Sequence, residues 1–480
     1  MDKNIIINIF ATLTSKILGV VKARVFSSIF GASYIADAIN FAFKIPNSFR
    51  KIVAEGSLTY ALMPVINEDI INKLLTFLIL LFSAVFVLVT AFSYEIIEFF
   101  SQFDHVTNLI SASLLPYFII FLFLISFSCI FTTILQKNSR FLIKSIAPLF
   151  FTITLIWTML DSKTPESFGI GVIRGGLVQL TILYFAIRRY KLKLRLNFNF
   201  FSPNFKLFFR DFIKASGSTL ITIVGFQITY YLASGLVEGS VTALDNSLMF
   251  YQLLFGVLVV SVIDVYYPKF LNFGKQYLPE ALENIFALVI PGSIAMYFLA
   301  EETIAVILLT GQFTLDNTLV TASLLKIYVM GIIFSASLTA FIRYYMANKK
   351  YNTYLITNLA LTILDLTTTI ILIKNGMGAK SIPIGFIVSY LIILIYYISI
   401  TKIDYKALSK KIAKIIIVNI PLFVLFTLYN NYKTSWYYSG SNLINLLSAV
   451  ALYLGAIVIT LVLYYIFNVD FIFKKKLLNK

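Results

Sequence analysis

Three basic residues and one acidic residue lie inside the first apolar runs of the chain: Lys16, Lys22, Arg50 and Asp37. A lysine or arginine near the centre of a bilayer costs on the order of 2.5–3.5 kcal/mol on insertion scales, so such residues usually face an aqueous cavity and its ligand. We therefore interpret these four residues as candidates for a binding site. No set of residues in this region predicts a catalytic centre.

The first helix that positions these residues is expected over 4–30. On an ideal helix Lys16, Lys22 and Arg24 point about 120° apart, so they face one cavity only if the helix bends. Gly19 is the expected place of the bend. Arg24 lies near the outer end of the helix, and the alternative for it is that its side chain reaches the lipid headgroups.

The second helix is expected over 34–62, after a tight turn at Gly31. Pro46 removes a backbone hydrogen bond and should kink this helix, and Asn47 and Arg50 follow it within about one turn. The alternative for Arg50 is that, with the neighbouring Lys51, it anchors the cytoplasmic end. Three further residues are expected to mark the end of the membrane-spanning part: Glu55, Gly56 and Pro64.

Composition restricts the class of protein. The 480 residues are 59% hydrophobic and 13% charged, and the mean hydropathy is +0.88, which is typical of a polytopic membrane protein. One cysteine (Cys129) and one histidine (His105) exclude a disulfide framework, a zinc site and a histidine-based triad. The net charge of +17 is carried by clusters between apolar runs, which indicates membrane topology rather than nucleic-acid binding.

Apolar runs of about 20 residues predict an all-α protein with about fourteen membrane-spanning helices. These are expected over 4–30, 34–62, 74–100, 107–136, 140–160, 167–187, 207–237, 242–272, 282–309, 318–346, 352–373, 381–400, 411–429 and 441–467. Lysine and arginine gather in alternate loops, so we expect both termini in the cytoplasm.

A basic segment divides the chain. We expect an N-terminal lobe of six helices over 1–190, a basic cytoplasmic linker over 191–206, a second lobe of six helices over 207–401, and two additional helices over 402–480. The linker alternates basic residues with leucine and phenylalanine. It is either an amphipathic segment in the membrane interface or a linker that lies on anionic lipid, and we favour the linker.

The two halves resemble each other weakly, as in transporters built from repeats. Gly31 and Asp37 are six positions apart at the start of the second helix, and Gly239 and Asp245 repeat this spacing at the start of the eighth. Six helices separate the copies, so the repeats would be parallel. Common turn chemistry is the alternative explanation.

One ordered set of residues identifies a family. The set comprises Ala36-Asp37-Ala38, Phe43-Lys44-Ile45-Pro46-Asn47, Arg50, Ala54-Glu55-Gly56, Ala61 and Pro64-Val65. Weaker matches lie at Gly175-Gly176 with Gln179, from Gly256 to Pro268, and at Gly311-x-Phe313-Thr314. This pattern resembles the MurJ (MviN) family of lipid II flippases, within the multidrug/oligosaccharidyl-lipid/polysaccharide exporter superfamily.

The resemblance implies two lobes in a V around a cationic cavity, and transport without covalent chemistry. The implied substrate is lipid II, the undecaprenyl-pyrophosphate-linked peptidoglycan precursor, moved across a bacterial inner membrane by alternating access. The family's cavity arginines map onto Lys16, Lys22 and Arg50, and its cavity aspartate onto Asp37. The last two helices would form a groove for the lipid tail. Membrane lipids and cell-wall synthesis proteins are further expected partners.

The sequence departs from the family in the eighth helix. The cavity arginine usual there aligns with Met249, and a nearby acidic position aligns with Gln252, which we retain as a candidate substrate-binding residue. Arg174, in the sixth helix, is expected at the same depth as Met249, and Gly175-Gly176 after it would let another helix approach. We hypothesise that Arg174 supplies the missing charge. The alternative is that Arg174 reaches the outer headgroups and that the second lobe binds through polar groups such as Gln252 and Asn246.

Asp365 is expected in the middle of the eleventh helix, beside Thr362, Thr367 and Thr368. A carboxylate with hydroxyl groups suits a hard cation, so Asp365 is a candidate sodium site, and a packing aspartate is the alternative. No other cofactor is expected, and coupling to the membrane potential is an alternative to sodium.

Two other functions compete with lipid II flipping. One is a flippase for another polyprenyl-linked glycan or a cation-coupled exporter of the same superfamily. The other is a membrane glycosyltransferase, which needs an acidic catalytic residue on a sizeable outer loop. The outer loops here are short, and Asp104, His105 and Glu166 form no such constellation.

Overall fold

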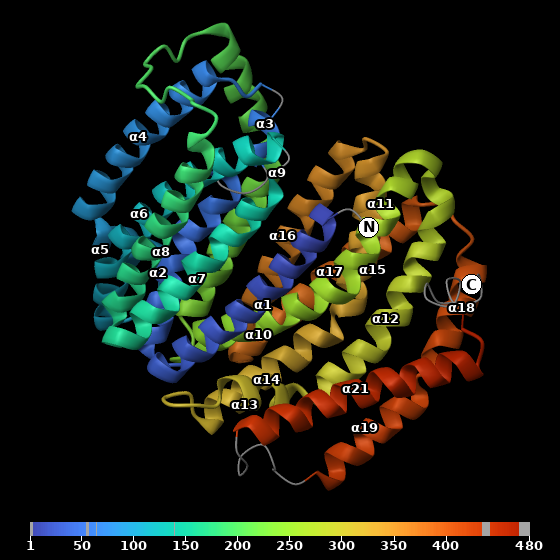
Figure 1. Cartoon of the computed structure of the whole chain (residues 1–480). Coiled ribbons are helices and arrows are strands. Elements are labelled where there is room, and N and C mark those ends of the chain that lie inside the picture. The colour runs from blue at the N-terminus through green and yellow to red at the C-terminus, as the bar shows by residue number, and fades with distance from the viewer. Residues whose placement is uncertain (1–2, 54–56, 64, 139, 434–441, 470–480) are drawn as a thin grey trace. The chain divides into compact units, whose positions relative to one another are not determined.

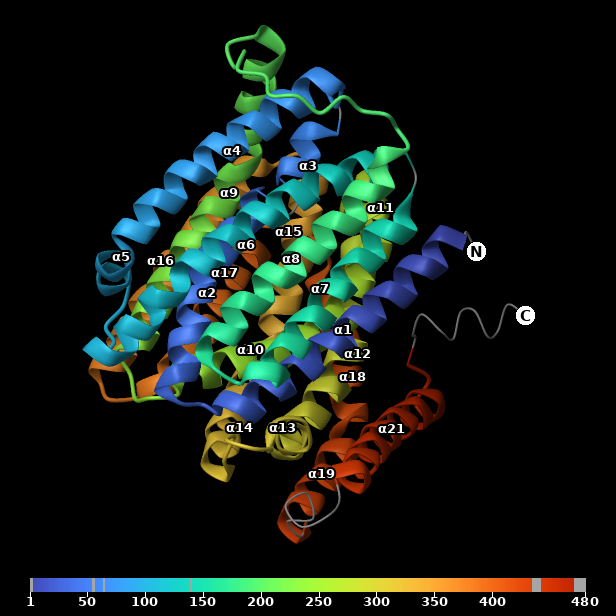
Figure 2. The same cartoon turned by 60° about the vertical axis from the view of Figure 1, so that its left-hand side comes forward.

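The computed structural model describes residues 3–53, 57–63, 65–138, 140–433 and 442–469, and every regular element in these ranges is a helix (Figures 1 and 2). This confirms the all-α fold. Among these residues nine helices are long and apolar enough to cross a membrane, or ten if the bent pair Leu315–Met330 and Ile332–Ala347 is one span. The chain is a multi-pass membrane protein, and the count of fourteen spans is not confirmed.

The difference in count has two sources. One is that the stretch Ser240–Phe298, which holds three α-helices, is counted once although its 59 residues exceed one crossing. The other is the charge of one helix. The helix Tyr34–Val53 is not among the nine spans, and its 20 residues include Asp37, Lys44, Arg50 and Lys51. A helix with this many charges falls below the apolarity of an ordinary span. The charges that mark the candidate site therefore lower the hydropathy of the helix that carries it.

The chain forms two compact units, which divide at Thr242. The first unit comprises Met1–Thr242 and Thr310–Phe313, coloured blue to green in Figure 1 apart from the short second segment. Its helices are α1 (Lys3–Phe30), α2 (Tyr34–Val53), α3 (Ser57–Leu62), α4 (Glu68–Ala91), α5 (Ser93–Phe100), α6 (His105–Lys137), α7 (Phe141–Ser162), α8 (Pro165–Arg188) and α9 (Pro203–Ser234). The α6 helix is central and contacts α2, α4, α5 and α8, while α1 packs along α7.

Glycines on α8 let it pack between α6 and α7. A Cβ on Gly175 would lie 2.7 Å from the carbonyl oxygen of Phe151 on α7, and one on Gly176 would lie 3.0 Å from Leu124 on α6. The expected close approach at Gly175-Gly176 is therefore confirmed, and two neighbouring helices use it.

The second unit comprises Ala243–Leu309 and Thr314–Lys480. Its helices are α10 (Ser240–Phe255, of which the first residues belong to the first unit), α11 (Ser261–Phe273), α12 (Leu278–Phe298), α13 (Ala300–Leu308), α14 (Leu315–Met330), α15 (Ile332–Ala347), α16 (Tyr351–Lys374), α17 (Ser381–Ile400), α18 (Tyr405–Val418), α19 (Ile420–Tyr432) and α21 (Asn442–Ile466). A π-helical segment, Gly256–Val260, joins α10 to α11.

The last three helices pack on α12 and α13 inside the second unit. Lys433, at the end of α19, donates to the buried carboxylate of Glu302 on α13 at 2.9 Å. Tyr453 of α21 makes a hydrogen bond of 2.7 Å with Thr303. These polar contacts attach the additional helices to α13, whereas the expected lipid-tail groove on them stays a prediction.

The boundary of the compact units differs from the one expected at the basic linker. The α9 helix follows the linker but packs against α2 and α3, within the first unit. Lys44 of α2 lies 4.8 Å from the ring centre of Tyr230 on α9, and Lys51 lies 4.6 Å from that of Phe226. Cation–π contacts of this kind hold α9 to α2.

Candidate functional site

The basic candidates lie on two helices that share one turn. At 1.5 Å per residue, Lys16 is about 21 Å from the end of α1 at Phe30, and Arg50 is about 24 Å from the start of α2 at Tyr34. Asn47 lies about 20 Å from the same start, and Lys22 about 12 Å from Phe30. Lys16 therefore lies at about the same distance from the turn as Asn47 and Arg50. Lys22 lies nearer to the turn.

Aromatic contacts show which faces of α1 and α2 converge. Phe26 of α1 and Phe43 of α2 each contact Phe168 of α8, with ring centres 5.5 Å apart in both pairs. Lys22 lies one turn before Phe26, on the same face of α1. Asn47 and Arg50, four and seven residues after Phe43, continue the face of α2 that carries Phe43.

The candidate binding surface is therefore Lys22, Asn47 and Arg50, on the two converging faces. Lys16 points about 120° away from Lys22 around α1. Gly19 lies between the two lysines, in the interior of one helix that runs from Lys3 to Phe30. Pro46 lies inside α2, which is assigned as helix on both sides of it. Glu55, Gly56 and Pro64 lie outside the described residues.

Asp37 is part of a separate structure near the turn. It is only 2% exposed, and its carboxylate accepts hydrogen bonds from the backbone N–H of Gly239 at 2.8 Å and of Thr242 at 2.8 Å. The hydroxyl of Thr242 donates a third at 2.7 Å. The structure thus gives Asp37 a role in holding the start of α10. The substrate-binding role expected from the sequence stays a prediction.

Three turns meet around Asp37, and each contains a glycine with positive φ. These are Gly31 at +64°, Gly239 at +82° and Gly311 at +58°. A Cβ on them would lie 2.6 Å from the carbonyl oxygen of Gln312, 2.4 Å from that of Ala32 and 2.2 Å from that of Ser28, respectively. We call this set, with Asp37 and Thr242, the turn junction. Sequence reasoning singled out all three glycines but did not predict that they meet.

The repeated Gly-x5-Asp spacing does not produce the same local structure twice. Asp37 lies in the first turn of α2, which begins at Tyr34, three residues after Gly31. The α10 helix begins at Ser240, directly after Gly239, so Asp245 lies in its second turn. A carboxylate in the first turn of a helix is favoured by the helix dipole, and that benefit falls off within one turn.

In the second unit, Gln252 is exposed and Met249 is half-buried on α10. Asn246, one turn earlier, is buried, and its amide Nδ2 has no hydrogen-bond partner among the described residues. The π-helical segment begins at Gly256, one turn after Gln252, and π-helical turns are frequent at functional sites. Asn246 is thus available as a donor, as the alternative to the Arg174 hypothesis expects.

Arg174 lies on the exposed face of α8. Leu177 and Phe185, three and eleven residues later on that face, are also exposed. The buried glycines Gly175 and Gly176 occupy the faces that contact α7 and α6. An apolar exposed stripe is typical of a lipid-facing surface, which favours the alternative that the Arg174 side chain reaches the headgroups.

Asp365 lies on α16 against a glycine of α17. A Cβ on Gly385 would lie 3.0 Å from the Asp365 carboxylate and 2.3 Å from the hydroxyl of Thr369. No described residue donates a hydrogen bond to the Asp365 carboxylate, and the hydroxyl of Thr362 instead donates to the backbone at Asn358. Because Gly385 has no side chain, the Thr369 hydroxyl and the Asp365 carboxylate both lie close to its backbone. Thr369 was not among the residues selected from the sequence.

A cation bound at Asp365 would have few charged ligands around it. The described part of the chain holds no cluster of three histidine, cysteine, aspartate or glutamate residues that could bind a metal ion. Asp365 would supply the one carboxylate, with hydroxyl and carbonyl oxygens around it. Oxygen ligands of this kind suit a hard cation such as sodium, whereas zinc and copper are bound by thiolate and imidazole ligands.

Comparisons with known proteins agree on one family. The family model described as "Lipid II flippase MurJ" matches residues 26–468. The "Probable lipid II flippase MurJ" of Borreliella burgdorferi is 27% identical over 470 residues, which cover 92% of this chain and 93% of the relative.

Solved structures show the same fold. One described as "Lipid II flippase MurJ, inward closed conformation" is similar with a TM-score of 0.81 and 24% identity, over 98% of this chain and 100% of that one. An inward-facing multidrug resistance MATE family transporter of the MOP superfamily is similar with a TM-score of 0.65 and 11% identity, over 86% of this chain and 99% of that one. On the family match over nearly its whole length, this chain belongs to the lipid II flippase MurJ family and is a transporter rather than an enzyme.

Proposed function

We propose that this protein moves lipid II from the cytoplasmic to the outer leaflet of a bacterial inner membrane, by alternating access, for peptidoglycan synthesis. The observation that carries the proposal is the set of basic side chains inside α1 and α2 of a chain that matches the flippase family. The pyrophosphate of lipid II is an anion, and its polyprenyl tail is compatible with a site that opens to lipid. Both properties suit cations that lie within apolar helices.

In this proposal Lys22, Asn47 and Arg50 bind the pyrophosphate, and Lys16 extends the cationic surface at the level of Arg50. The lysines keep the charge of an arginine but lack its bidentate fork, so Arg50 is the residue able to bind two phosphate oxygens at once. Asn47 adds an uncharged donor one turn away.

Release on the outer side requires that the turn junction near Asp37 change. Asp37, Gly239 and Thr242 form a dense set of hydrogen bonds and backbone contacts there. We infer that this set stabilises one state of the transport cycle. The membrane potential favours outward movement of a negative charge by about 2.3 kcal/mol per 100 mV when the outside is positive. Sodium bound at Asp365 is the other source of coupling that we propose.

Orientation and partners are part of the same proposal. Both termini are expected in the cytoplasm, because lysine and arginine gather in the loops on that side. Lipid II would then enter from the cytoplasmic leaflet. Membrane lipids and cell-wall synthesis proteins are the further partners that we expect.

The test is depletion of the protein in its native host, followed by a leaflet-specific assay of lipid II. The proposal requires lipid II to accumulate in the inner leaflet as the protein is lost. Unchanged outer-leaflet lipid II, in cells shown to hold no second flippase, would contradict it. Accumulation of a different polyprenyl-linked glycan would instead support the alternative substrate.

A further inference from the structure

Backbone groups of the basic linker bind side chains of α4. The side-chain amide of Asn72 donates to the carbonyl of Lys193 at 3.0 Å, and its oxygen accepts from the N–H of Arg195 at 3.1 Å. The N–H of Asn197 donates to the hydroxyl of Thr76 at 2.8 Å, one turn further along α4. Residues 193, 195 and 197 therefore bond α4 in alternation, as in an extended chain, and residues 191–199 form no helix.

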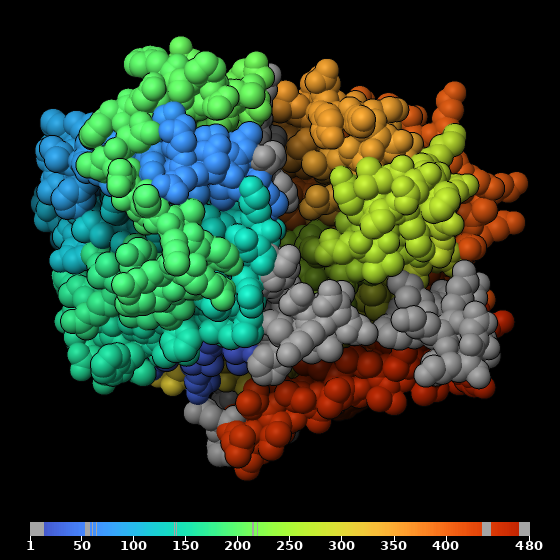
Figure 3. All heavy atoms as spheres, turned by 45° about the horizontal axis from the view of Figure 1, so that its top comes forward, coloured from blue at the N-terminus to red at the C-terminus, as the bar shows by residue number. Residues whose placement is uncertain are grey.

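An extended chain places alternate residues on opposite sides. Leu194, Leu196 and Phe198 therefore share one side, and all three are exposed. Lys193 and Arg195 are exposed on the other side. Figure 3 shows the green linker beside the blue first turns of α4 on one face of the first unit. An exposed ribbon with one apolar and one cationic side is typical of a membrane interface.

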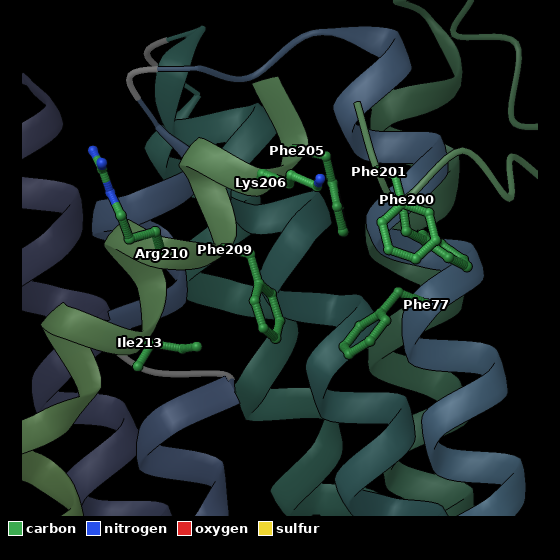
Figure 4. Close-up of a pocket in the computed structure, with 8 residues that line it drawn as sticks. All are labelled: Phe77, Phe200, Phe201, Phe205, Lys206, Phe209, Arg210 and Ile213. Carbon is green, nitrogen blue, oxygen red and sulfur yellow. The ribbon is translucent and has the colours of Figure 1, made fainter. Parts of the chain in front are cut away.

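A cavity of about 540 Å³ adjoins the end of this linker. It is lined by Phe77 of α4, Phe200 and Phe201 of the linker, and Phe205, Lys206, Phe209, Arg210 and Ile213 at the start of α9 (Figure 4). The volume is within the range of about 300–1,000 Å³ usual for small-molecule sites. The lining is almost wholly aromatic or aliphatic, which suits a hydrocarbon chain.

Two basic residues line the cavity, Lys206 and Arg210, and their side chains lie differently. The Lys206 amine lies 5.3 Å from the ring centre of Phe201, which is 80% exposed. Arg210 also lines the cavity, but in Figure 4 its guanidinium points away from the aromatic rings. Its Nε lies 3.5 Å from Asp211, so that charge is partly balanced. Lys206 is therefore the cation directed at the cavity.

We propose that this cavity binds one anionic phospholipid, with an acyl chain among the phenylalanine rings and the phosphate beside Lys206. The geometry orients the lipid: Lys206 and Phe201 lie near the start of α9, and Phe209 and Ile213 lie one to two turns further along the helix. The cationic side of the linker adds positive charge on the headgroup side. This inference is independent of the proposed flippase function.

Photocrosslinking of the full chain in nanodiscs tests the proposal. The probes are phosphatidylglycerol and phosphatidylcholine, each with a diazirine in the acyl chain and each added as a minor component to unlabelled phosphatidylcholine. Adducts on Phe77 and on residues 200–213 should form with phosphatidylglycerol about fivefold more than with phosphatidylcholine, because one lysine near an anionic lipid has an effect of this order. Equal yields of adducts with the two lipids, or no adducts there with either lipid, would overturn the proposal. The cavity would then be a candidate site for a protein partner instead.

Three variants separate the contributions. Lys206→Gln should remove the preference for phosphatidylglycerol, whereas Arg210→Gln, which removes the same charge one turn away, should keep it. Ile213→Trp should fill the cavity and reduce adducts of both lipids. All three positions are exposed or at the rim, so folding is checked simply by elution as a single species. Equal loss of preference in Lys206→Gln and Arg210→Gln would show a general charge effect and contradict a defined site.

Discussion

Two aspartates inside helices of this protein have opposite surroundings. Asp37 on α2 is buried and accepts three hydrogen bonds from Gly239 and Thr242, whereas Asp365 on α16 accepts none from the described residues. A carboxylate that is supplied with donors is stabilised as part of the fold. One without donors is costly unless it binds a proton or a cation. The difference indicates that Asp37 organises structure and that Asp365 is available for a ligand.

Of the substitutions that test this comparison, Asp37→Ala is expected to lower stability most. It leaves two backbone N–H groups and one hydroxyl buried without their acceptor, which should cost about 3 kcal/mol or more. We expect a clearly lower Tm in detergent and less protein in the membrane. Asp37→Asn keeps one acceptor oxygen and should lose less. Normal Tm and abundance of Asp37→Ala would show that the three hydrogen bonds are dispensable.

The next effect concerns the turn junction itself. Gly239→Ala places a Cβ 2.4 Å from the Ala32 carbonyl oxygen, at a φ of +82°. Gly376→Ala is the matched control, since its φ is +79° and nothing lies within 4 Å of the added Cβ. The backbone cost of about 1–2 kcal/mol is common to both, so the additional loss of Tm in Gly239→Ala measures the contact. Similar Tm values for the two variants would argue against tight packing at the junction.

Asp365→Asn should affect transport more than stability, in contrast to the substitutions of Asp37. Because no donor is lost, the Tm should change by less than that of Asp37→Asn, while transport should lose its dependence on sodium. Gly385→Ala, which crowds the Asp365 carboxylate and the Thr369 hydroxyl, should weaken the same dependence. Transport equally sensitive to sodium in Asp365→Asn and in the parent would remove Asp365 from the site.

The smallest effect is expected at Arg174. Its exposed, apolar face on α8 predicts that Arg174→Ala transports at nearly the parental rate. The competing hypothesis, that Arg174 replaces the family arginine missing at Met249, predicts impaired transport that Met249→Arg partly restores. Measurement of transport by the single and double variants decides between the two. Impairment without rescue would contradict both.

Much of the fold was predictable because membrane helices are specified by long apolar runs. The expected spans over 107–136, 167–187, 352–373 and 381–400 agree with α6, α8, α16 and α17 within a few residues. Hydropathy does not show a break inside an apolar run: the expected span over 282–309 is divided at Leu299 into α12 and α13. The π-helical segment at Gly256–Val260 lies inside the expected span over 242–272 and does not end it. The expected division at 191–206 stays a prediction. The compact first unit also includes α9, whose packing on α2 leaves no signal in hydropathy.

The candidate site was predictable in composition but not in arrangement. The cost of a charge among apolar residues identified Lys22, Arg50 and Asp37 together, since each is equally anomalous in the sequence. Only the partners distinguish them: Asp37 contacts a turn about 200 residues away, and that pairing is a property of the folded chain. Asn72 and Thr76, which bind the linker, had no signal because polar residues near a helix start are common.

The most direct test of the central claim is the outer-leaflet level of lipid II in depleted cells that express Arg50→Ala. Arg50→Lys at the same abundance is the control, because it keeps the charge and loses only the bidentate fork. We expect Arg50→Ala to resemble cells without the protein and Arg50→Lys to retain part of the transport. Full outer-leaflet lipid II with Arg50→Ala at parental abundance would contradict a phosphate-binding role for the basic residues of α1 and α2.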